Sequence, residues 1–159
     1  MRKYIFFALV LVGCRHAEPD LGETLQWMHD FVAVSGGFYS TSERGYWRDS
    51  YVFDSHGCHV TLTDKAERRE DPSLKDYIET SDFSLKDLDP ATVKTVVDPS
   101  PATVDAETFN SRELIIRKED GVITYPAHGI GVFFYKGEDA QRFATALRHA
   151  IVLCGRQQP

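Results

Sequence analysis

The stretch GEDAQRFATALRHAIVLCG, residues 137–155, decides how this chain folds. Apolar side chains recur in it at helical spacing and form one continuous stripe, made of Ala140, Phe143, Ala144, Leu147, Ile151 and Cys154. Glu138 and Asp139 suit the positive N-terminal end of a helix, and Gly155 suits a C-terminal cap. We therefore expect a terminal amphipathic helix that packs its stripe on a sheet, with Cys154 on the buried side.

A second helix is predicted near the start of the chain, over residues 19–33. Asp20 can cap it, and Glu23, three residues later, completes a capping-box pattern. The apolar face that this helix would present consists of Leu21, Leu25, Met28 and Val32, widened by Trp27 and Phe31. Gly36 and Gly37 end this region.

Between the two helices the hydrophobic period changes to that of β-strands. Residues 45–55 are rich in aromatic and β-branched side chains, and residues 56–65 alternate, so that Cys58 and Val60 point to one face and His59 to the other. A turn at residues 56–57 would join these two strands. Further strands are predicted at residues 76–85, 92–97, 103–109, 113–119 and 129–136, which gives seven, and the short VITY at 122–125 would add to them.

This order of elements predicts an α+β domain: an N-terminal helix, about seven antiparallel strands in a bent sheet or partly open barrel, and a C-terminal helix packed on it. Over residues 45–155 it resembles the pleckstrin-homology-like fold, which implies that the last helix closes one end of the bent sheet. A lipocalin-like barrel with an end helix is the alternative. The segments FSLKDLDPATV (83–93) and RFATALRHAIVLCG (142–155) also resemble an uncharacterised bacterial family without an assigned activity.

The first fourteen residues have the layout of an export signal. Arg2 and Lys3 are basic, residues 5–12 are almost wholly apolar, and a small residue, Gly13, precedes Cys14. The apolar run is far shorter than the ~20 residues that a membrane-spanning helix needs. The sequence LVGC, residues 11–14, resembles the lipobox of bacterial lipoproteins, which implies cleavage before Cys14 and acylation of that cysteine.

The lipobox resemblance sets the expected organisation and location of the chain. It predicts a signal peptide at residues 1–13, a short tether at 14–19, one globular domain at 20–155 and a disordered tail at 156–159. The protein would then lie in the cell envelope, anchored by lipid to a membrane outside the cytoplasm. Arg15 after the cysteine favours the periplasm-facing outer membrane if the organism is Gram-negative.

Composition limits the classes of partner. The 159 residues carry a formal net charge of −6, and 42% of them are hydrophobic, which is enough for a real core. Removing residues 1–13 removes two of the 18 basic residues and none of the 24 acidic ones, so the mature chain would carry −8. An acidic chain is a poor ligand for nucleic acid, and we predict no nucleic-acid partner.

If Cys14 carries lipid, two of the three cysteines remain to be assigned. Cys58 and Cys154 would then remain, in a compartment where paired thiols are oxidised, and we predict a disulfide between them. Two buried free thiols are the alternative. The bridge would join the terminal helix to an early strand.

Residues able to carry chemistry are scattered rather than arranged in a known motif. His56, Cys58 and His59 are suitable zinc ligands, but a fourth ligand is missing and a disulfide would remove the thiolate. We therefore assign no catalytic residue, no metal site and no cofactor. The aromatic residues Tyr46, Trp47 and Tyr51 are the candidate binding surface, because such side chains could line a groove for a sugar or peptide.

These observations favour a membrane-anchored binding or assembly module for a protein, a peptide or an envelope component. Two alternatives belong to other classes. A small envelope hydrolase would need His56, His59 or His128 to converge with a carboxylate or serine. A periplasmic enzyme inhibitor is the other, because small disulfide-linked lipoproteins of that kind exist.

Overall fold

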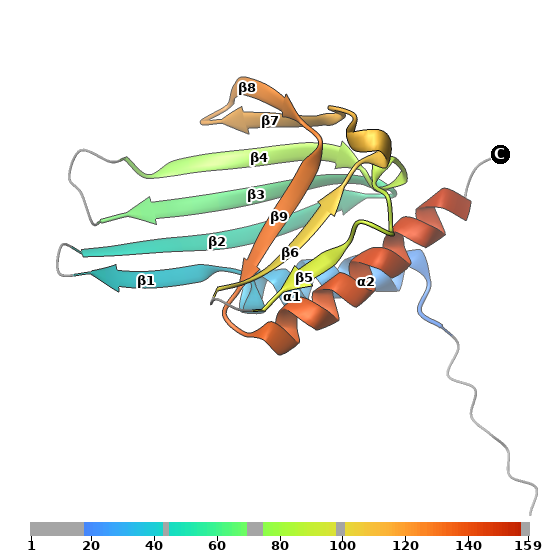
Figure 1. The fold of residues 1–159 in the computed structure, drawn as a ribbon, viewed down its shortest axis with the longest axis horizontal. Coiled ribbons are helices and arrows are strands. Elements are labelled where there is room, and N and C mark those ends of the chain that lie inside the picture. Colours follow the sequence, from blue (N-terminus) through green and yellow to red (C-terminus); the bar gives the residue numbers. More distant parts are fainter. Residues whose placement is uncertain (1–17, 43–44, 70–74, 98–100, 157–159) are drawn as a thin grey trace, which may run out of the picture.

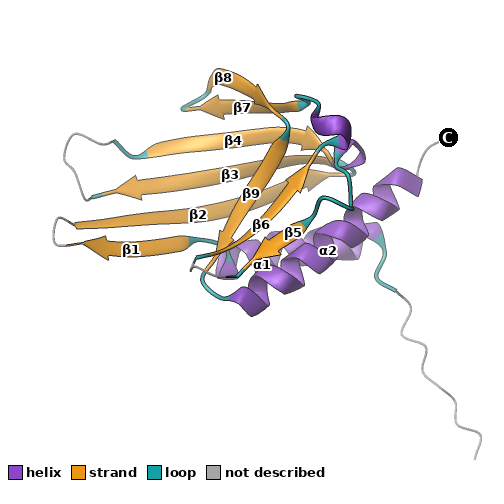
Figure 2. Ribbon diagram, viewed as in Figure 1, coloured by secondary structure: helices purple, strands orange, loops and turns teal. Residues whose placement is uncertain are grey.

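The computed structural model describes residues 18–42, 45–69, 75–97 and 101–156. In these ranges the chain forms two α-helices, nine β-strands and two short 3-10 helices (Figures 1 and 2). In chain order they are α1 (Leu21–Ser35), β1 (Phe38–Ser42), β2 (Gly45–His56), β3 (His59–Arg68), β4 (Tyr77–Ser84), η1 (Leu85–Asp87), β5 (Lys94–Val96), β6 (Ala102–Glu107), η2 (Phe109–Ser111), β7 (Ile115–Glu119), β8 (Val122–Ala127), β9 (Gly129–Phe134) and α2 (Gly137–Arg156).

The strands form two antiparallel sheets. The larger sheet has the order β1-β2-β3-β4-β7-β8, and the smaller has the order β5-β6-β9. Figure 1 shows the smaller sheet crossing over one part of the larger one. The predicted α+β class with bent antiparallel strands between two helices is confirmed. The larger sheet stays open, with β1 and β8 at its edges, so the alternative of a closed lipocalin-like barrel is wrong.

Each of the seven predicted strands has a counterpart, and two further strands complete the larger sheet. The VITY segment lies within β8, which is longer and runs from Val122 to Ala127. β1 was not predicted, because FYSTS has no alternation of apolar and polar side chains. It is a strand because it pairs with β2 along its whole length, from Phe38 opposite Asp49 to Ser42 opposite Gly45.

The predicted capping box of α1 is present. The backbone N–H of Glu23 donates to Asp20 Oδ1 at 2.9 Å, and the backbone N–H of Asp20 donates to Glu23 Oε2 at 3.1 Å. The helix ends at a Gly36 cap, and Gly37 follows with a φ of +139°. A Cβ atom on Gly37 would lie 2.6 Å from the carbonyl oxygen of Asp49, so only glycine lets the chain turn from α1 into β1 here.

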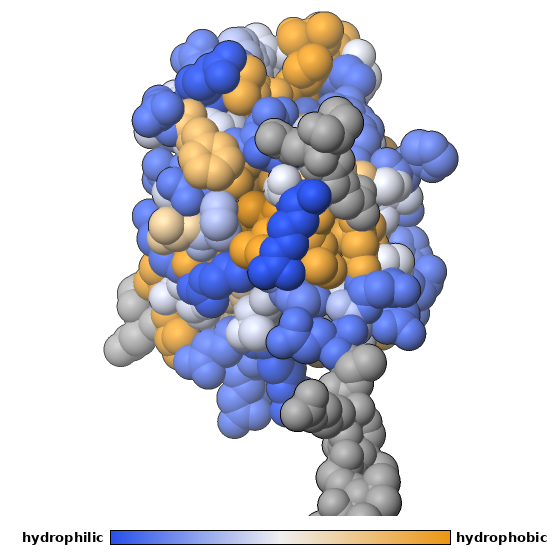
Figure 3. All heavy atoms as spheres, turned by 90° about the vertical axis from the view of Figure 1, so that its right-hand side faces the viewer, coloured by the Kyte–Doolittle hydropathy of each residue, from blue (hydrophilic) through white to orange (hydrophobic). Residues whose placement is uncertain are grey.

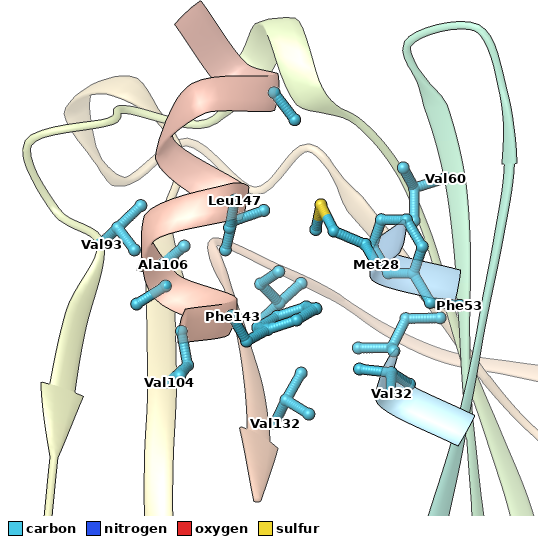
Figure 4. Packing of buried hydrophobic residues seen from close by; sticks show 14 of the residues in the cluster. Met28, Val32, Phe53, Val60, Val93, Val104, Ala106, Val132, Phe143 and Leu147 are labelled. Atoms are coloured by element: carbon cyan, nitrogen blue, oxygen red, sulfur yellow. The ribbon is translucent and has the colours of Figure 1, made fainter. Parts of the chain in front are cut away.

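The hydrophobic core lies where α2 meets both sheets and α1. Figure 4 shows Phe143 and Leu147 of α2 between residues of the smaller sheet and residues of α1, β2 and β3. The ring of Phe143 lies 6.2 Å from that of Phe53 and 5.2 Å from that of Phe134, measured between centroids. The buried residues of α2 are Ala140, Phe143, Ala144, Leu147, Ala150, Ile151 and Cys154, which contain the whole predicted stripe.

The predicted disulfide between Cys58 and Cys154 is confirmed. Their Cα atoms lie 5.8 Å apart, although 96 positions separate them in the sequence. Cys58 lies in the turn between β2 and β3, one residue before the strand on which it was expected. The bridge fixes the last turn of α2 to the end of the β2–β3 hairpin.

The ends of the chain are only partly described. The predicted signal peptide, Cys14 and most of the tether lie outside the described residues. α2 continues through Arg156, so the first residue of the expected tail belongs to the helix. Among the described helices, none combines the length and the hydropathy needed to span a bilayer.

Candidate binding surfaces

The aromatic surface predicted from the sequence divides into an exposed part and a buried part. Tyr46 and Trp47 on β2 are half-buried and reach the surface. Tyr51 is only 4% exposed, and its hydroxyl hydrogen-bonds the backbone of Phe133. The prediction of Tyr51 as a surface residue is therefore wrong, because the smaller sheet covers this part of β2.

Trp47 belongs to a compact group of aromatic and charged side chains. The guanidinium carbon of Arg68 lies 3.5 Å from the centroid of the Trp47 ring and 5.1 Å from that of Tyr77. The same guanidinium donates to the Tyr77 hydroxyl at 2.8 Å, and Trp47 Nε1 donates to Asp49 Oδ1 at 2.7 Å. The group joins β2, β3 and β4 on one face, because Trp47 lies opposite Arg68 and Ala66 lies opposite Tyr77.

Two carboxyl groups on the same strands, those of Asp49 and Asp64, continue this cluster of side chains toward the core. Asp49 is 2% exposed, and burial raises its pKa against the lowering effects of Trp47 and Arg68. Burial, followed by the nearby Asp49 and Glu79 carboxylates, raises the pKa of Asp64 to about 7. Asp64 Oδ1 has no hydrogen-bond partner among the described residues. The result is a polar patch within a sheet face that elsewhere forms the core.

The β7–β8 hairpin presents the most exposed apolar side chains of the described strands. Val122 is 69% exposed, Ile123 65% and Tyr125 54%, while Ile116 on β7 is 47% exposed. β8 pairs only with β7, so its outer backbone edge has no strand beside it. In Figure 3, apolar side chains gather at the top of the molecule, where Figure 1 places β7, β8 and the adjoining η2. We call Ile116, Val122, Ile123 and Tyr125 the edge patch.

A mostly apolar groove of about 710 Å³ runs between α1 and α2. Trp27 on α1, which is 39% exposed and stacks on Phe31 at 4.4 Å, forms part of its wall. Ala146 and Thr145 line it from α2. The chain enters the domain at Pro19, whose carbonyl oxygen lies 2.9 Å from His149 Nε2 at the groove.

A second, polar groove of about 830 Å³ brings together a histidine, an aspartate and a serine that sequence reasoning did not combine. His29 lies 2.8 Å from the Phe53 carbonyl oxygen and 3.4 Å from Asp54 Oδ1 through its Nδ1 atom. Ser55 also lines this groove, but no hydrogen bond joins it to His29 among the described contacts. The contacts of His29 fasten α1 to β2.

The three histidines considered for a hydrolase do not converge on one another. His56 and His59 are partners across the β2–β3 hairpin, and His128 follows β8. β4 and β7 lie between β3 and β8, so His59 and His128 are three strand spacings apart, about 14 Å in a sheet.

Of these histidines, His59 has a serine and a carboxylate nearby. It lies opposite Ser84, and it helps to lower the pKa of Asp82, which is already bonded to Lys118 and Thr61. Within the described residues, no group of three or more His, Cys, Asp or Glu side chains could hold a metal ion.

Comparison with protein-family models, curated proteins and solved structures finds no match to this chain. The described residues form a small α+β domain with a disulfide between Cys58 and Cys154.

The edge patch and the carboxyl pair were missed for different reasons. Val122, Ile123 and Tyr125 were predicted only as part of a short additional strand, and the strand order alone shows that they lie at an open edge. Asp49 and Asp64 approach each other because Tyr51 pairs with Asp64 across β2 and β3, and that register is not readable from either strand alone.

Proposed function

We propose that this protein is a lipid-anchored binding module of the bacterial cell envelope, and that it docks an extended segment of a partner protein along β8. The observation that carries the proposal is the edge patch on β8, a strand that pairs with β7 on one side and has no strand beside its outer edge. Proteins generally protect such edges with charges, short strands or a covering element, because exposed edges recruit further strands. An edge left open with large apolar side chains is suited to strand addition.

The chemistry of the edge indicates the kind of segment that fits. The residues of β8 are Val-Ile-Thr-Tyr-Pro-Ala, without a single charge, while Arg117 and Lys118 lie on the neighbouring β7. Pro126 has no backbone N–H, so the part of β8 that can pair with a partner is its first four residues, Val122 to Tyr125. A partner strand would pair its backbone with β8 and place its side chains alternately on the two faces of the sheet, beside the edge-patch side chains of β8. We propose a partner segment that is extended, apolar and free of lysine and arginine at its centre.

A second copy of the chain is a less suitable occupant. The full chain carries a net charge of −6, so two copies repel each other over the whole surface. A different protein need not meet that repulsion.

The membrane anchor completes the proposal and rests on the sequence. LVGC at residues 11–14 supports acylation of Cys14, and the confirmed disulfide is the chemistry expected of an exported domain. The proposed location is the envelope, outside the cytoplasm. A hydrolase or enzyme inhibitor has no comparable support among the described surfaces.

The test is a selection from a phage-displayed library of random peptides, followed by hydrogen exchange on the purified disulfide-bonded protein. We expect apolar peptides that slow exchange of β8 amides. Ile123→Lys is expected to weaken their binding by about tenfold or more, because a buried charge opposes the contact. The matched control is Val34→Lys, at an apolar residue of α1 that is 84% exposed, and it should bind normally.

Two results would overturn the docking proposal. One is a set of selected peptides that protect a different surface and bind Ile123→Lys as well as the native chain. The other is a dimer of the native protein in sedimentation velocity that Ile123→Lys dissociates, because the occupant of β8 would then be a second copy.

A further inference from the structure

Two adjoining hollows lie where the chain turns from β8 into β9, which then crosses over the larger sheet (Figure 1). One hollow, of about 300 Å³, lies over β6 and β9, and the other, of about 390 Å³, lies beside the end of β8. Arg117, His128 and Gly129 line both, so the two share a wall. We call them the paired hollows. Their volumes lie within the range of sites that hold small molecules.

Glycines form the floor of the hollow over β6 and β9. Side chains on these two strands alternate between a buried and a more exposed face, and Gly129 and Gly131 both fall on the more exposed one. A Cβ atom would lie 3.3 Å from Asp105 Oδ1 if added to Gly131, and 3.1 Å from the Ala106 carbonyl oxygen if added to Gly129. Glycine within a strand often marks a place where a ligand approaches the backbone closely. A flat ring can lie here directly on the backbone of β9.

Arg117 is fixed at the wall that the two hollows share. Its Nη2 atom donates to the Gly129 carbonyl oxygen at 3.0 Å. Its Nη1 atom donates to the Tyr125 hydroxyl at 3.4 Å and lies 3.7 Å from Glu79 Oε1. A guanidinium group carries five N–H donors, so these contacts orient it and leave donors for a ligand.

The charges that line the hollow over β6 and β9 are balanced. Lys94 lies opposite Asp105 across β5 and β6, and Glu107 lies further along β6. The two cations of this lining, Lys94 and Arg117, therefore accompany two carboxylates. A charged ligand would meet a group of its own sign, which opposes binding. A hydroxyl group can donate to a carboxylate and accept from a cation, so a neutral ligand with several hydroxyls can satisfy both kinds.

The hollow beside β8 adds flat apolar surface. Tyr125 and Pro126 both line it, and Tyr125 is exposed. A tyrosine ring offers an apolar face together with a polar hydroxyl, which suits a ligand that has C–H groups on its faces and hydroxyls on its rim.

We infer that the paired hollows bind a neutral saccharide of one or two rings. A sugar ring combines the features that the lining calls for, namely a flat C–H face for the glycine floor and the tyrosine ring, and hydroxyls for the mixed charges around them. A purely apolar ligand fits less well, because it would strip water from charged groups without replacing their hydrogen bonds. The site does not depend on docking at the outer edge of β8, because Ile123 lines neither hollow.

The experiment titrates neutral disaccharides into the purified, isotope-labelled, disulfide-bonded protein and follows the backbone amides by NMR. The probes are cellobiose, maltose, lactose and N,N′-diacetylchitobiose, with glucuronic acid and glucosamine as charged comparisons. We expect at least one neutral probe to shift the amide resonances of Gly129 and Gly131 while those of Gly57 and Gly121, in distant hairpin turns, stay in place. Added sodium chloride should leave the affinity unchanged, because the ligand carries no charge.

Variants of the floor and the rim make the result specific. Gly131→Val raises the floor with a residue that strands favour, and should weaken binding by about tenfold or more. Gly155→Val is the matched control, because a Cβ atom there meets nothing within 4 Å, and it should bind normally. Glu107→Gln keeps the shape but removes a charged acceptor, and should weaken binding by about threefold or more even if Gly131→Val fails to fold. Ile123→Lys should bind the saccharide normally.

Three results would overturn the saccharide site. One is that no neutral probe binds. Another is a neutral probe that shifts amides elsewhere and binds Gly131→Val and Glu107→Gln as well as the native chain. The last is binding of the charged probes alone, weakened by salt, which would show an ion site. Each of these results leaves docking on β8 intact, because that proposal rests on the edge patch.

Discussion

Asp64 is a partly buried carboxyl group whose surroundings raise its pKa well above the ordinary value. It lies opposite Tyr51 on β2 and opposite Glu79 on β4, so its neighbours on both sides are acidic or buried. Its pKa of about 7 arises chiefly from burial, then from Asp49 and Glu79, while Arg68 lowers it. Since the pKa in the folded state exceeds the ordinary value of 3.8, the folded protein binds the proton more tightly than the unfolded chain.

The sign of the pH dependence follows from this difference. The native protein should lose stability as the pH rises from about 4 to about 7, because the charged form of Asp64 is disfavoured in the fold. Asp64→Asn removes the charge and should unfold with a free energy about 1–3 kcal/mol higher at pH 8, given that one pKa unit corresponds to about 1.4 kcal/mol. Urea unfolding at pH 4 and pH 8 measures it. An equal effect at both pH values would contradict the prediction.

The pKa of Asp82 is shifted in the opposite direction to that of Asp64. Lys118 Nζ lies 2.7 Å from its Oδ2 atom and Thr61 donates to its Oδ1 atom at 2.7 Å, and these two hydrogen bonds lower its pKa. Its contribution is present above the unfolded pKa and is lost as the pH falls. Asp82→Asn should therefore destabilise the protein at pH 8, by about 1 kcal/mol for this partly exposed pair. The loss should shrink toward pH 3, and urea unfolding at pH 8 and pH 3 measures it.

The sequence predicted Asp20 as the N-cap of α1, and a substitution can test this role. Its side chain and that of Glu23 satisfy two backbone N–H groups at the start of α1. Asp20→Ala should lower the free energy of unfolding by about 1 kcal/mol. Asp30→Ala is the control: Asp30 lies on the exposed side of α1, and its Oδ1 atom accepts from Gln26 at 3.0 Å. Equal losses in the two variants would show that the cap adds nothing.

The prediction at Asp20 was correct and the one at Tyr51 was wrong, and the range of the contacts involved explains both outcomes. A capping box is a local pattern, complete within four residues, so the sequence specifies it. The burial of Tyr51 depends on Phe133, 82 positions later, which the smaller sheet brings over β2. Single residues whose environment comes from distant strands cannot be placed by a local pattern.

At the level of elements, the disulfide joins two parts of the fold that were each predicted separately. Cys154 is fully buried in the last turns of α2, and Cys58 lies at the end of the β2–β3 hairpin. A bridge across 96 positions restricts the unfolded chain strongly. Helix–sheet contact alone would leave the end of α2 free to separate from the hairpin.

Loss of the bridge should be measurable in two independent ways. Replacement of both cysteines by alanine should lower the free energy of unfolding by about 2–4 kcal/mol, because the unfolded chain regains the freedom of a long loop. The native protein in dithiothreitol should show a similar loss with both side chains retained. Urea unfolding monitored by tryptophan emission compares the two. A change below about 1 kcal/mol in both would contradict the prediction.

The elements themselves were predictable to different degrees. Both helices follow from apolar stripes at helical spacing, and seven strands follow from alternation and turn residues. β1 has neither signal and exists through its pairing with β2. The division into two sheets depends on β7 returning to β4 and on β9 pairing with β6, and such long-range pairings are not encoded in any one segment.

For the whole molecule, the proposed anchor predicts where the protein is found. The chain carries a net charge of −6, so it gains no bulk attraction to anionic lipid headgroups. Among its described helices none can span a bilayer. Membrane association should therefore depend on acyl chains at Cys14 and should resist washing with 1 M salt, about ten times the ionic strength at which the Debye length is about 10 Å.

Cys14→Ala should move the protein from the membrane fraction to the soluble fraction of the cell envelope, because no other described feature replaces several acyl chains. The double variant of Cys58 and Cys154 is the matched control, since it removes cysteines and weakens the fold but keeps the anchor, and it should stay with the membranes. Cell fractionation with and without the salt wash measures both. If Cys14→Ala remains membrane-bound after the wash, the proposed anchor is wrong. Docking on β8 depends only on the edge patch and would still stand.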